Sequence, residues 1–192
     1  NFNRASSNQK TRLDSLKKAK LIFIAGGDQS RFMEVVLQTP VWDAIHEAYK
    51  NGATIAGTSA GAAVMSRYMI TGKELLGDTT YHATFRKIWK NNIEFQEGLG
   101  LLPKAIIDQH FIARSRYNRL FSALAAFPEF PCIGIDEATA IIVKGDKATV
   151  TGESQVIVLK QPKNLQTTEK GLIKLNDVHL SIYTEGDVFD LR

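Results

Sequence analysis

Cysteine is nearly absent from the chain, which has 192 residues and only Cys132. A single cysteine cannot form an intrachain disulfide, and it cannot build a thiolate metal cluster. Because Cys132 lies in an apolar run, we expect it to be a small, buried hydrophobic side chain. The length is sufficient for one domain with its own hydrophobic core, so no covalent cross-link is needed.

The chain also lacks a long hydrophobic run. No apolar segment approaches the ~18–20 residues that span a membrane, so we expect no membrane association. No signal-peptide pattern is visible. The first residue is Asn1 rather than methionine, so a leader could precede it, and both a cytoplasmic and a secreted location stay open.

Charge of one sign does not dominate either. Lys and Arg number 24 against 20 Asp and Glu, which leaves a net charge of +4. The lysines are scattered and the aromatic residues do not alternate with a basic stripe, so nucleic-acid binding is disfavoured. Neither G-x-G-x-x-G nor G-x-x-x-x-G-K occurs, which argues against a nucleotide-binding loop.

Short apolar runs alternate with helical patterns along the first two thirds of the chain. Such runs are typical of parallel strands that are buried on both faces. We expect the first helix to be capped by Ser7 or Asn8. The expected elements are helices over 9–18, 28–38, 40–50, 60–67 and 114–126, and strands over 21–25, 53–56, 104–108 and 132–136.

From Ala138 onward the pattern changes to antiparallel hairpins, followed by a polar loop over 161–170 and a strand over 178–183. Residues 68–98 show only weak periodicity, with a partly helical segment expected over 81–89. The order of elements predicts one α/β domain over 1–192, with an open, mostly parallel sheet and an antiparallel extension. In such sheets, sites form at the carboxyl ends of the strands.

A strand-turn-helix elbow stands out within this pattern, at Gly57-Thr58-Ser59-Ala60-Gly61. The G-x-S-x-G spacing places a serine at the tip of a sharp turn, where small neighbours let adjacent chains approach closely. The free N–H groups of the following helix would face a developing oxyanion. The alternative is a tight turn that carries a serine without chemistry.

A serine nucleophile requires a base, and the chain offers only four histidines. His110 follows a buried strand of the same sheet as Ser59, so it is our candidate base. His46 is expected on a helix surface, and His179 in the antiparallel region is expected to be structural. His82 lies in the weakly periodic segment and stays open.

The remaining parts of a catalytic centre also fall at strand ends. Glu137 is the best-placed acid to orient the histidine, with Asp108 and Asp136 as alternatives. The order Ser–His–Glu differs from that of ordinary α/β-hydrolases, which disfavours an esterase or lipase. Backbone N–H groups of Ala60 and of the Gly26-Gly27 turn are the candidate oxyanion hole.

Three arginines, Arg114, Arg116 and Arg119, open the helix expected after His110. Cations at a helix N-terminus oppose its dipole, so a purely structural role carries a cost. We interpret them as ligands for substrate carboxylates. The alternative is a set of solvated surface arginines with one or two ion pairs.

Four motifs together resemble the cyanophycinase family, serine peptidases with a glutamine-amidotransferase-like, three-layer α/β sandwich. They are Gly26-Gly27-Asp28-Gln29, Gly57 to Ala62, Asp108-Gln109-His110-Phe111 with the three arginines, and Gly134 to Ala140. The resemblance spans residues 21–143. It implies Ser59 as nucleophile, His110 as base, Glu137 as acid, and no metal or other cofactor. It also implies a substrate pocket lined by Gln29, Asp108, Gln109, Arg114, Arg116 and Arg119.

The resemblance further implies a substrate and a partner. Members of the family cleave cyanophycin, a polyaspartate with arginine on each side-chain carboxyl, to β-aspartyl-arginine dipeptides. Asp108 is a candidate partner for the substrate's guanidinium groups, and the family suggests a homodimer. Family members carry further N-terminal strands, so we expect the functional protein to be longer or another chain to fill that place. The alternatives are a dipeptidase for short aspartyl peptides and a catalytically inactive binding module.

Overall fold

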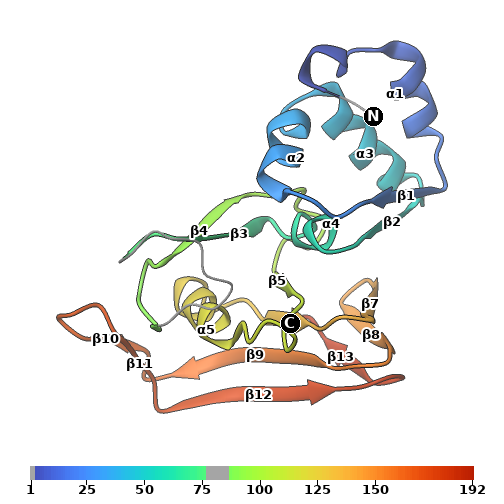
Figure 1. The fold of residues 1–192 in the computed structure, drawn as a ribbon. Helices are drawn as coiled ribbons and strands as arrows, with labels where there is room; N and C mark the ends of the chain where they lie inside the picture. Colours follow the sequence, from blue (N-terminus) through green and yellow to red (C-terminus); the bar gives the residue numbers. More distant parts are fainter. Residues whose placement is uncertain (1–2, 77–86) are drawn as a thin grey trace.

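The computed structural model describes residues 3–76 and 87–192 and has a mixed α/β fold with several small sheets. Three helices lie on one side of a parallel strand pair at the N-terminal end of the molecule, while the long C-terminal strands lie at the opposite end (Figure 1). The first group of elements is η1 (Arg4–Ser6), α1 (Lys10–Lys17), β1 (Leu21–Ile24), α2 (Gln29–Val36), α3 (Pro40–Lys50), β2 (Thr54–Gly57) and α4 (Ala60–Ala63).

Local sequence signals account for the bounds of α2 and α3. The Asp28 side chain caps α2 by accepting a hydrogen bond of 3.0 Å from the Arg31 backbone N–H. Pro40 occupies the first turn of α3, where its missing N–H costs nothing. Gly52 follows α3 with a φ of 89°, a conformation that glycine adopts without steric cost.

The expected cap of α1 is wrong. The helix begins after Gln9, which makes no capping hydrogen bond through its side chain. The Ser7 hydroxyl instead donates to the carbonyl of Arg4 at 2.7 Å, because the preceding turn of 3-10 helix offers it a closer acceptor.

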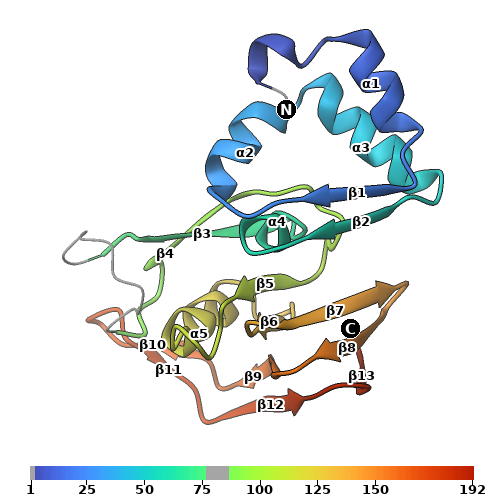
Figure 2. The ribbon, with the colours of Figure 1, turned by 45° about the vertical axis from the view of Figure 1, so that its right-hand side comes forward.

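The expectation that β1 is buried on both faces is also wrong. Ile22 and Ile24 pack under α2 and α3 in the first core cluster, but Leu21 is 61% exposed and Phe23 is 63% exposed. Side chains of a strand alternate between its two faces. The three helices cover only one face of β1, so alternate residues are left in contact with solvent (Figure 2).

The second group of elements builds the larger sheet and two hairpins. It comprises β3 (Tyr68–Glu74), β4 (Ile93–Glu97), β5 (Ile106–Gln109), α5 (Tyr117–Ala126), β6 (Cys132–Ile135), β7 (Thr139–Lys144), β8 (Lys147–Gly152), β9 (Val156–Lys163), β10 (Gln166–Thr167), β11 (Ile173–Lys174), β12 (Asp177–Tyr183) and β13 (Val188–Asp190). Cys132 is fully buried in β6, and this burial raises the pKa of its thiol.

The four-stranded sheet has the order β12-β9-β6-β5. Its β5–β6 pair is parallel, whereas β9 and β12 join it antiparallel. This sheet is therefore mixed rather than mostly parallel, because the C-terminal strands occupy the second edge of β6. The hairpin expected after residue 138 is present as β7 and β8, and the segment expected as a polar loop contains β10 and the end of β9.

The sequence reasoning missed the antiparallel pair β3–β4. Gly72 has a φ of 91°, and the register of the pair shifts between Ile70 and Glu74. This irregularity removes the strict alternation that marks a strand. The helix expected over 81–89 and His82 fall in or next to residues 77–86, which lie outside the described part of the chain. The strand expected to be the last, β12, is followed by β13.

Two helices are shorter than expected. The elbow helix α4 ends at Ala63, because the carbonyls of Val64 and Met65 accept hydrogen bonds from Leu99 and Leu102 instead of continuing the helix. The second helix, α5, begins at Tyr117. Among the helices of residues 3–76 and 87–192, none is long and apolar enough to cross a membrane.

Candidate active site

Ser59 occupies a strained turn between β2 and α4. Its φ of 53° and ψ of −114° lie in a region that non-glycine residues rarely adopt. The flanking glycines permit the tight packing around it: a Cβ on Gly57 would lie 2.1 Å from the Gly61 carbonyl oxygen, and one on Gly61 would lie 2.1 Å from the Ile24 carbonyl oxygen. The backbone that carries the serine is therefore fixed by the close packing of Gly57 against Gly61 and of Gly61 against Ile24.

His110 and Glu137 complete a hydrogen-bonded chain with this serine. Ser59 Oγ lies 2.9 Å from His110 Nε2, and His110 Nδ1 lies 2.8 Å from Glu137 Oε1. A carboxylate only accepts hydrogen bonds, so the proton sits on Nδ1 and Nε2 is left to accept from the serine hydroxyl. His110 has a φ of 49°, which turns its ring toward the elbow at the end of β5. The Glu137 side chain is 54% exposed.

The alternative acids are occupied elsewhere. Asp136 Oδ1 accepts from the N–H groups of Ile112 and Ala113 at 3.0 Å each, and its Oδ2 accepts from Ser154 at 2.7 Å. Burial alone would raise the pKa of Asp136, but these hydrogen bonds to its charged form outweigh burial and lower it. Asp136 therefore holds the turn that follows His110 instead of contacting the imidazole.

The other described histidines lie away from Ser59. His46 lies on α3 as expected, but it is half-buried: its ring lies 2.9 Å from the carbonyl oxygens of both Trp42 and Leu99 and links α3 to the segment before β5. His179 is exposed on β12, where it pairs in register with Lys160. His110 is thus the histidine that the described structure brings to the elbow.

The candidate oxyanion donors come from the residue after the serine and from the turn after β1. Ala60 directly follows Ser59 as the first residue of α4, and Gly27 lines the same cleft from the turn after β1. Gly27 has a φ of 140°, a conformation that L side chains rarely adopt. Because α4 has only four residues, its helix dipole is weaker than the sequence suggested.

The three arginines do not share a helix, contrary to expectation. Arg114 lies in the turn before α5, Arg116 is its N-cap and Arg119 is inside it. The interruption is Ser115, whose φ of 49° breaks the helical path. All three side chains nevertheless line one cleft, and Arg114 is the exposed member, whereas Arg116 and Arg119 are 4% exposed.

Asp108 is buried behind these arginines. It is not among the described residues that line the cleft. Arg119 Nε donates to Asp108 Oδ2 at 2.6 Å, and Arg119 Nη2 donates to Oδ1. Arg116 Nη1 lies 3.3 Å from the same Oδ1. The interpretation of Asp108 as a partner for substrate guanidinium groups is therefore wrong, because its carboxylate neutralises and orients the protein's own arginines.

Two glutamines connect the arginine side of the cleft to its other walls. Gln109 accepts from Arg116 Nη1 through its backbone carbonyl at 2.6 Å and its side-chain oxygen at 2.8 Å. Gln29 Nε2 donates to the carbonyls of Ile70 and Thr71 at 3.0 Å each. Gln29 thus fastens the start of α2 to β3, and both glutamines line the cleft.

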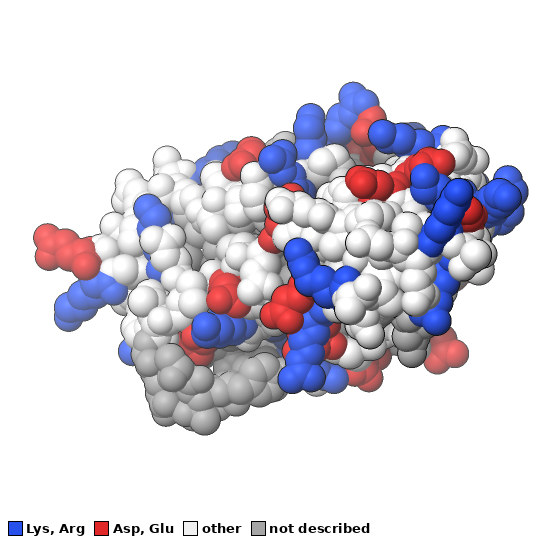
Figure 3. Space-filling view, turned by 90° about the horizontal axis from the view of Figure 1, so that it is seen from above, with Lys and Arg blue, Asp and Glu red and all other residues white. Residues whose placement is uncertain are grey.

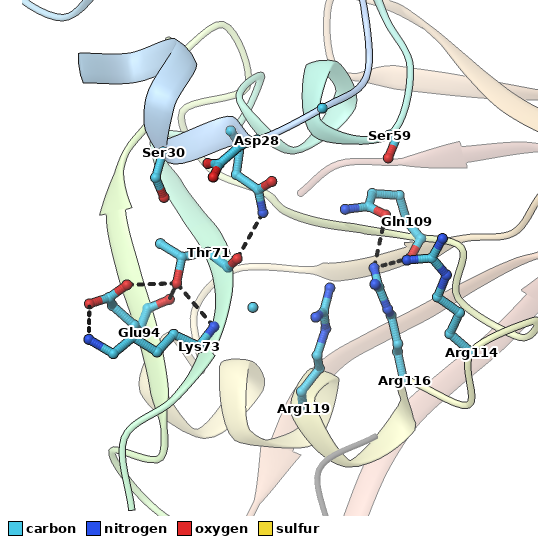
Figure 4. A pocket seen from close by; sticks show the side chains of 13 residues that line it. Asp28, Ser30, Ser59, Thr71, Lys73, Glu94, Gln109, Arg114, Arg116 and Arg119 are labelled. Atoms are coloured by element: carbon cyan, nitrogen blue, oxygen red, sulfur yellow. Dashed lines mark hydrogen bonds and ion pairs between the residues drawn. The ribbon is translucent and has the colours of Figure 1, made fainter. Parts of the chain in front are cut away.

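The cleft has a volume of about 420 Å³ and is bounded by residues from five parts of the chain. The β3–β4 wall was missed in the sequence, because its residues carry no motif and become neighbours only when the two strands pair. Figure 4 shows this wall on the side opposite the arginines, with Ser59 at the rim. The lining residues are Gly27, Asp28, Gln29, Ser30, Ser59, Thr71, Gly72, Lys73, Glu94, Gln109, Arg114, Arg116 and Arg119.

The described part of the face seen from above in Figure 3 carries no pattern of basic side chains typical of a nucleic-acid interface. In the view from above, Lys and Arg side chains alternate with Asp and Glu and form no continuous basic stripe on that face (Figure 3). Within residues 3–76 and 87–192, no group of three or more His, Cys, Asp or Glu side chains is placed to hold a metal ion.

Comparison with known proteins assigns the family. The sequence matches peptidase family S51 over residues 3–151. The chain belongs to this family. The resemblance inferred from the motifs is confirmed at this level, and S51 members are serine peptidases.

The relatives that the chain matches are longer than the chain. It is 36% identical over 184 residues to a cyanophycinase of Trichormus variabilis, covering 92% of this chain and 59% of that protein. It is 26% identical over 162 residues to a peptidase E of Actinobacillus pleuropneumoniae, covering 80% of this chain and 63% of the relative. The crystal structure of a peptidase from an acI-B1 actinobacterium superimposes with a TM-score of 0.69 at 24% identity, over 98% of this chain and 66% of that one. This last match supports the fold alone.

Proposed function

We propose that the protein is a serine peptidase that hydrolyses cyanophycin to β-aspartyl-arginine dipeptides. The observation that carries the proposal is the hydrogen-bonded chain from Ser59 through His110 to Glu137, with distances of 2.9 and 2.8 Å. Membership of a serine-peptidase family and 36% identity to a cyanophycinase support it. The finer fold class, a glutamine-amidotransferase-like sandwich, is part of the same proposal.

The geometry is suited to acyl transfer. Ser59 Oγ attacks the scissile carbonyl carbon while His110 Nε2 takes the hydroxyl proton, and the negative charge moves to the carbonyl oxygen. Glu137 stabilises the imidazolium through Nδ1. The imidazolium then gives its proton to the leaving amine as the C–N bond breaks, and an ester to Ser59 remains. Water, deprotonated by His110, attacks this ester. The imidazolium then returns the proton to Ser59 Oγ as the ester C–O bond breaks, which releases the acid and restores the free serine.

The oxyanion of each tetrahedral intermediate would be held by the backbone N–H groups of Ala60 and Gly27. Such donors act best when they are fixed before the reaction, since no reorganisation is then needed as charge develops. The tight packing of Gly57 against Gly61 and of Gly61 against Ile24 supplies this rigidity.

The arginine side of the cleft is suited to an acidic substrate. Each unit of cyanophycin carries a free α-carboxylate on its arginine, and a guanidinium binds a carboxylate through two parallel hydrogen bonds. Arg114 is exposed to the cleft, whereas Arg116 and Arg119 are held by Asp108 and Gln109. We assign carboxylate binding to this cluster, with Gln29 and Gln109 supporting its walls.

A second candidate is a dipeptidase acting on short aspartyl peptides. It is favoured by the similarity to a peptidase E and by the cleft volume of about 420 Å³, which suits a ligand of dipeptide size. The two functions differ in whether an insoluble polymer is degraded. Incubating the protein with cyanophycin and, separately, with free aspartyl dipeptides distinguishes them by their products.

The decisive experiment compares the protein with a Ser59→Ala variant on cyanophycin. We expect release of β-aspartyl-arginine by the protein and none by the variant. Ser30→Ala is a matched control, since Ser30 lines the same cleft but lies outside the Ser–His–Glu chain. Labelling by a fluorophosphonate should be lost only in Ser59→Ala. A folded protein without labelling or hydrolysis would instead indicate an inactive binding module.

A further inference from the structure

The β3–β4 wall gives the cleft a second polar end that the catalytic chain does not use. Thr71 and Lys73 come from β3, Glu94 comes from β4, and all three line the cleft. Figure 4 shows them facing one another across from Arg114, Arg116 and Arg119. The cleft is therefore cationic on the arginine side, while the opposite wall carries both the Glu94 carboxylate and the Lys73 ammonium.

The Glu94 carboxylate is held in place by its neighbours, but they occupy only part of its hydrogen-bond acceptor capacity. Thr71 donates its hydroxyl to Glu94 Oε2 at 2.8 Å, and Lys73 Nζ lies 3.6 Å from Oε1. The second distance is longer than a hydrogen bond, so the lysine, whose side chain is 64% exposed, forms only a loose ion pair. A carboxylate has about four acceptor positions, and the Glu94 side chain retains 27% exposure at the cleft wall.

The other carboxylates near the cleft are less suited to bind a ligand cation. Asp108 is buried and already neutralised by Arg116 and Arg119. Asp28 accepts from the Arg31 N–H as the cap of α2, and its side chain is 54% exposed. Water screens an exposed charge much more than a half-buried one. Glu94 is thus the carboxylate that combines a fixed position with access to the cleft.

We propose that Glu94 binds the guanidinium of a substrate arginine while the arginine cluster binds a substrate carboxylate. This inference rests on the proposed function, because a β-aspartyl-arginine unit carries both charges within one dipeptide. The Lys73 ammonium moves aside when the guanidinium enters, since it is held by a loose, exposed contact. Glu94 is then a specificity-determining residue that selects a cationic side chain.

The test measures dipeptide binding by calorimetry, so that it does not depend on turnover. Ser59→Ala protein is titrated with β-aspartyl-arginine and with β-aspartyl-citrulline, whose urea group has nearly the same shape as guanidinium but no charge. We expect the arginine dipeptide to bind about 10- to 100-fold more tightly, as a charge-assisted hydrogen bond predicts. Adding Glu94→Gln should remove this preference and leave citrulline binding nearly unchanged.

Glu97→Gln is the matched control, because Glu97 lies on the same strand β4 and is exposed outside the cleft lining. It removes the same charge and should keep the preference for arginine. A Lys73→Gln variant should bind the arginine dipeptide at least as tightly as the parent protein. If it instead loses affinity for both dipeptides, the lysine rather than the glutamate binds the ligand, and the proposal is overturned.

The remaining outcomes separate this proposal from the proposed function. Equal binding of the two dipeptides, or an undiminished preference in Glu94→Gln, would refute the role of Glu94 while peptidase activity on cyanophycin stays intact. Binding of neither dipeptide, together with no hydrolysis of cyanophycin by the protein, would refute both. Equal weakening of both dipeptides by Glu94→Gln would show a structural role of Glu94 and also overturn the proposal.

Discussion

Removing the charge of Asp108 should destabilise the protein strongly. Its carboxylate side chain is 0% exposed and lies against two guanidiniums whose side chains are 4% and 5% exposed. In an Asp108→Asn variant these cations lose their counter-charge but stay buried. Breaking a buried ion pair from one side typically costs about 3–5 kcal/mol, a large part of the roughly 5–15 kcal/mol by which proteins are stable.

Urea denaturation followed by circular dichroism measures this loss. With a slope of about 2 kcal/mol per molar urea, the expected change lowers the midpoint by about 1.5–2.5 M. The matched control is Asp28→Asn. Asparagine caps a helix about as well as aspartate, and the Asp28 side chain is 54% exposed, so its midpoint should hardly move.

The comparison of these two variants tests the reasoning directly. If Asp108→Asn shifts the midpoint no further than Asp28→Asn, then Asp108 does not neutralise the buried arginines. In that case the cleft arginines are balanced by another group. The assignment of Asp108 as a structural rather than a ligand-binding carboxylate would have to be withdrawn.

Three further substitutions test the site and its support. Glu137→Gln keeps a hydrogen-bond acceptor but removes the charge opposite His110, so kcat on cyanophycin should fall by about 10- to 1000-fold; the exposure of Glu137 makes the loss smaller than for a buried partner. Gly61→Ala would place a Cβ 2.1 Å from the Ile24 carbonyl oxygen, and thermal unfolding should show a loss of roughly 1–3 kcal/mol. Asp136→Asn should lower the melting temperature at neutral pH. Because the native pKa of Asp136 is lowered, its stabilisation is present above the unfolded carboxyl pKa of about 4 and is lost as the pH falls through the lower native value.

Each of these expectations has a contrary outcome. An unchanged kcat in Glu137→Gln would mean that the carboxylate does not stabilise the imidazolium. A Gly61→Ala protein as stable as the parent would show that the backbone of β1 can shift to accommodate the added methyl group without a loss of stability. A stability difference between the protein and Asp136→Asn that persists unchanged well below pH 4 would show that hydrogen bonds to the charged form are not its cause.

Much of the site could be predicted because its parts are local signals. The elbow around Ser59, His110 after a buried apolar run and Glu137 after the next one each follow from short patterns, and the sheet brings such strand ends together. The bounds of α3 follow equally from Pro40 and the Asn51-Gly52 stop. In the structure, Ser59 lies within hydrogen-bond distance of His110, and His110 lies within hydrogen-bond distance of Glu137. Their catalytic role stays a prediction.

Other features depend on contacts between segments far apart in the sequence. Nothing in the sequence around Asp108 distinguishes a ligand from a buried counter-charge, and the choice follows from the fold of the turn through Ser115, which directs Arg116 and Arg119 inward. The two exposed apolar side chains of β1 could not be foreseen, because a run of apolar residues does not reveal how many faces will be covered.

The amino-acid sequence by itself determined the family, the elbow and the order of the candidate nucleophile and base, since these reside in short contiguous motifs. Only the tertiary structure decided which carboxylate meets His110, which aspartate the arginines hold, and that Glu94 faces the cleft. The physical reason is that the pairing of β3 with β4 and the left-handed backbone at His110 and Ser115 are set by long-range packing. The placement of the arginine cluster on one side of the cleft and of Glu94 on the other is therefore a property of the fold rather than of any motif.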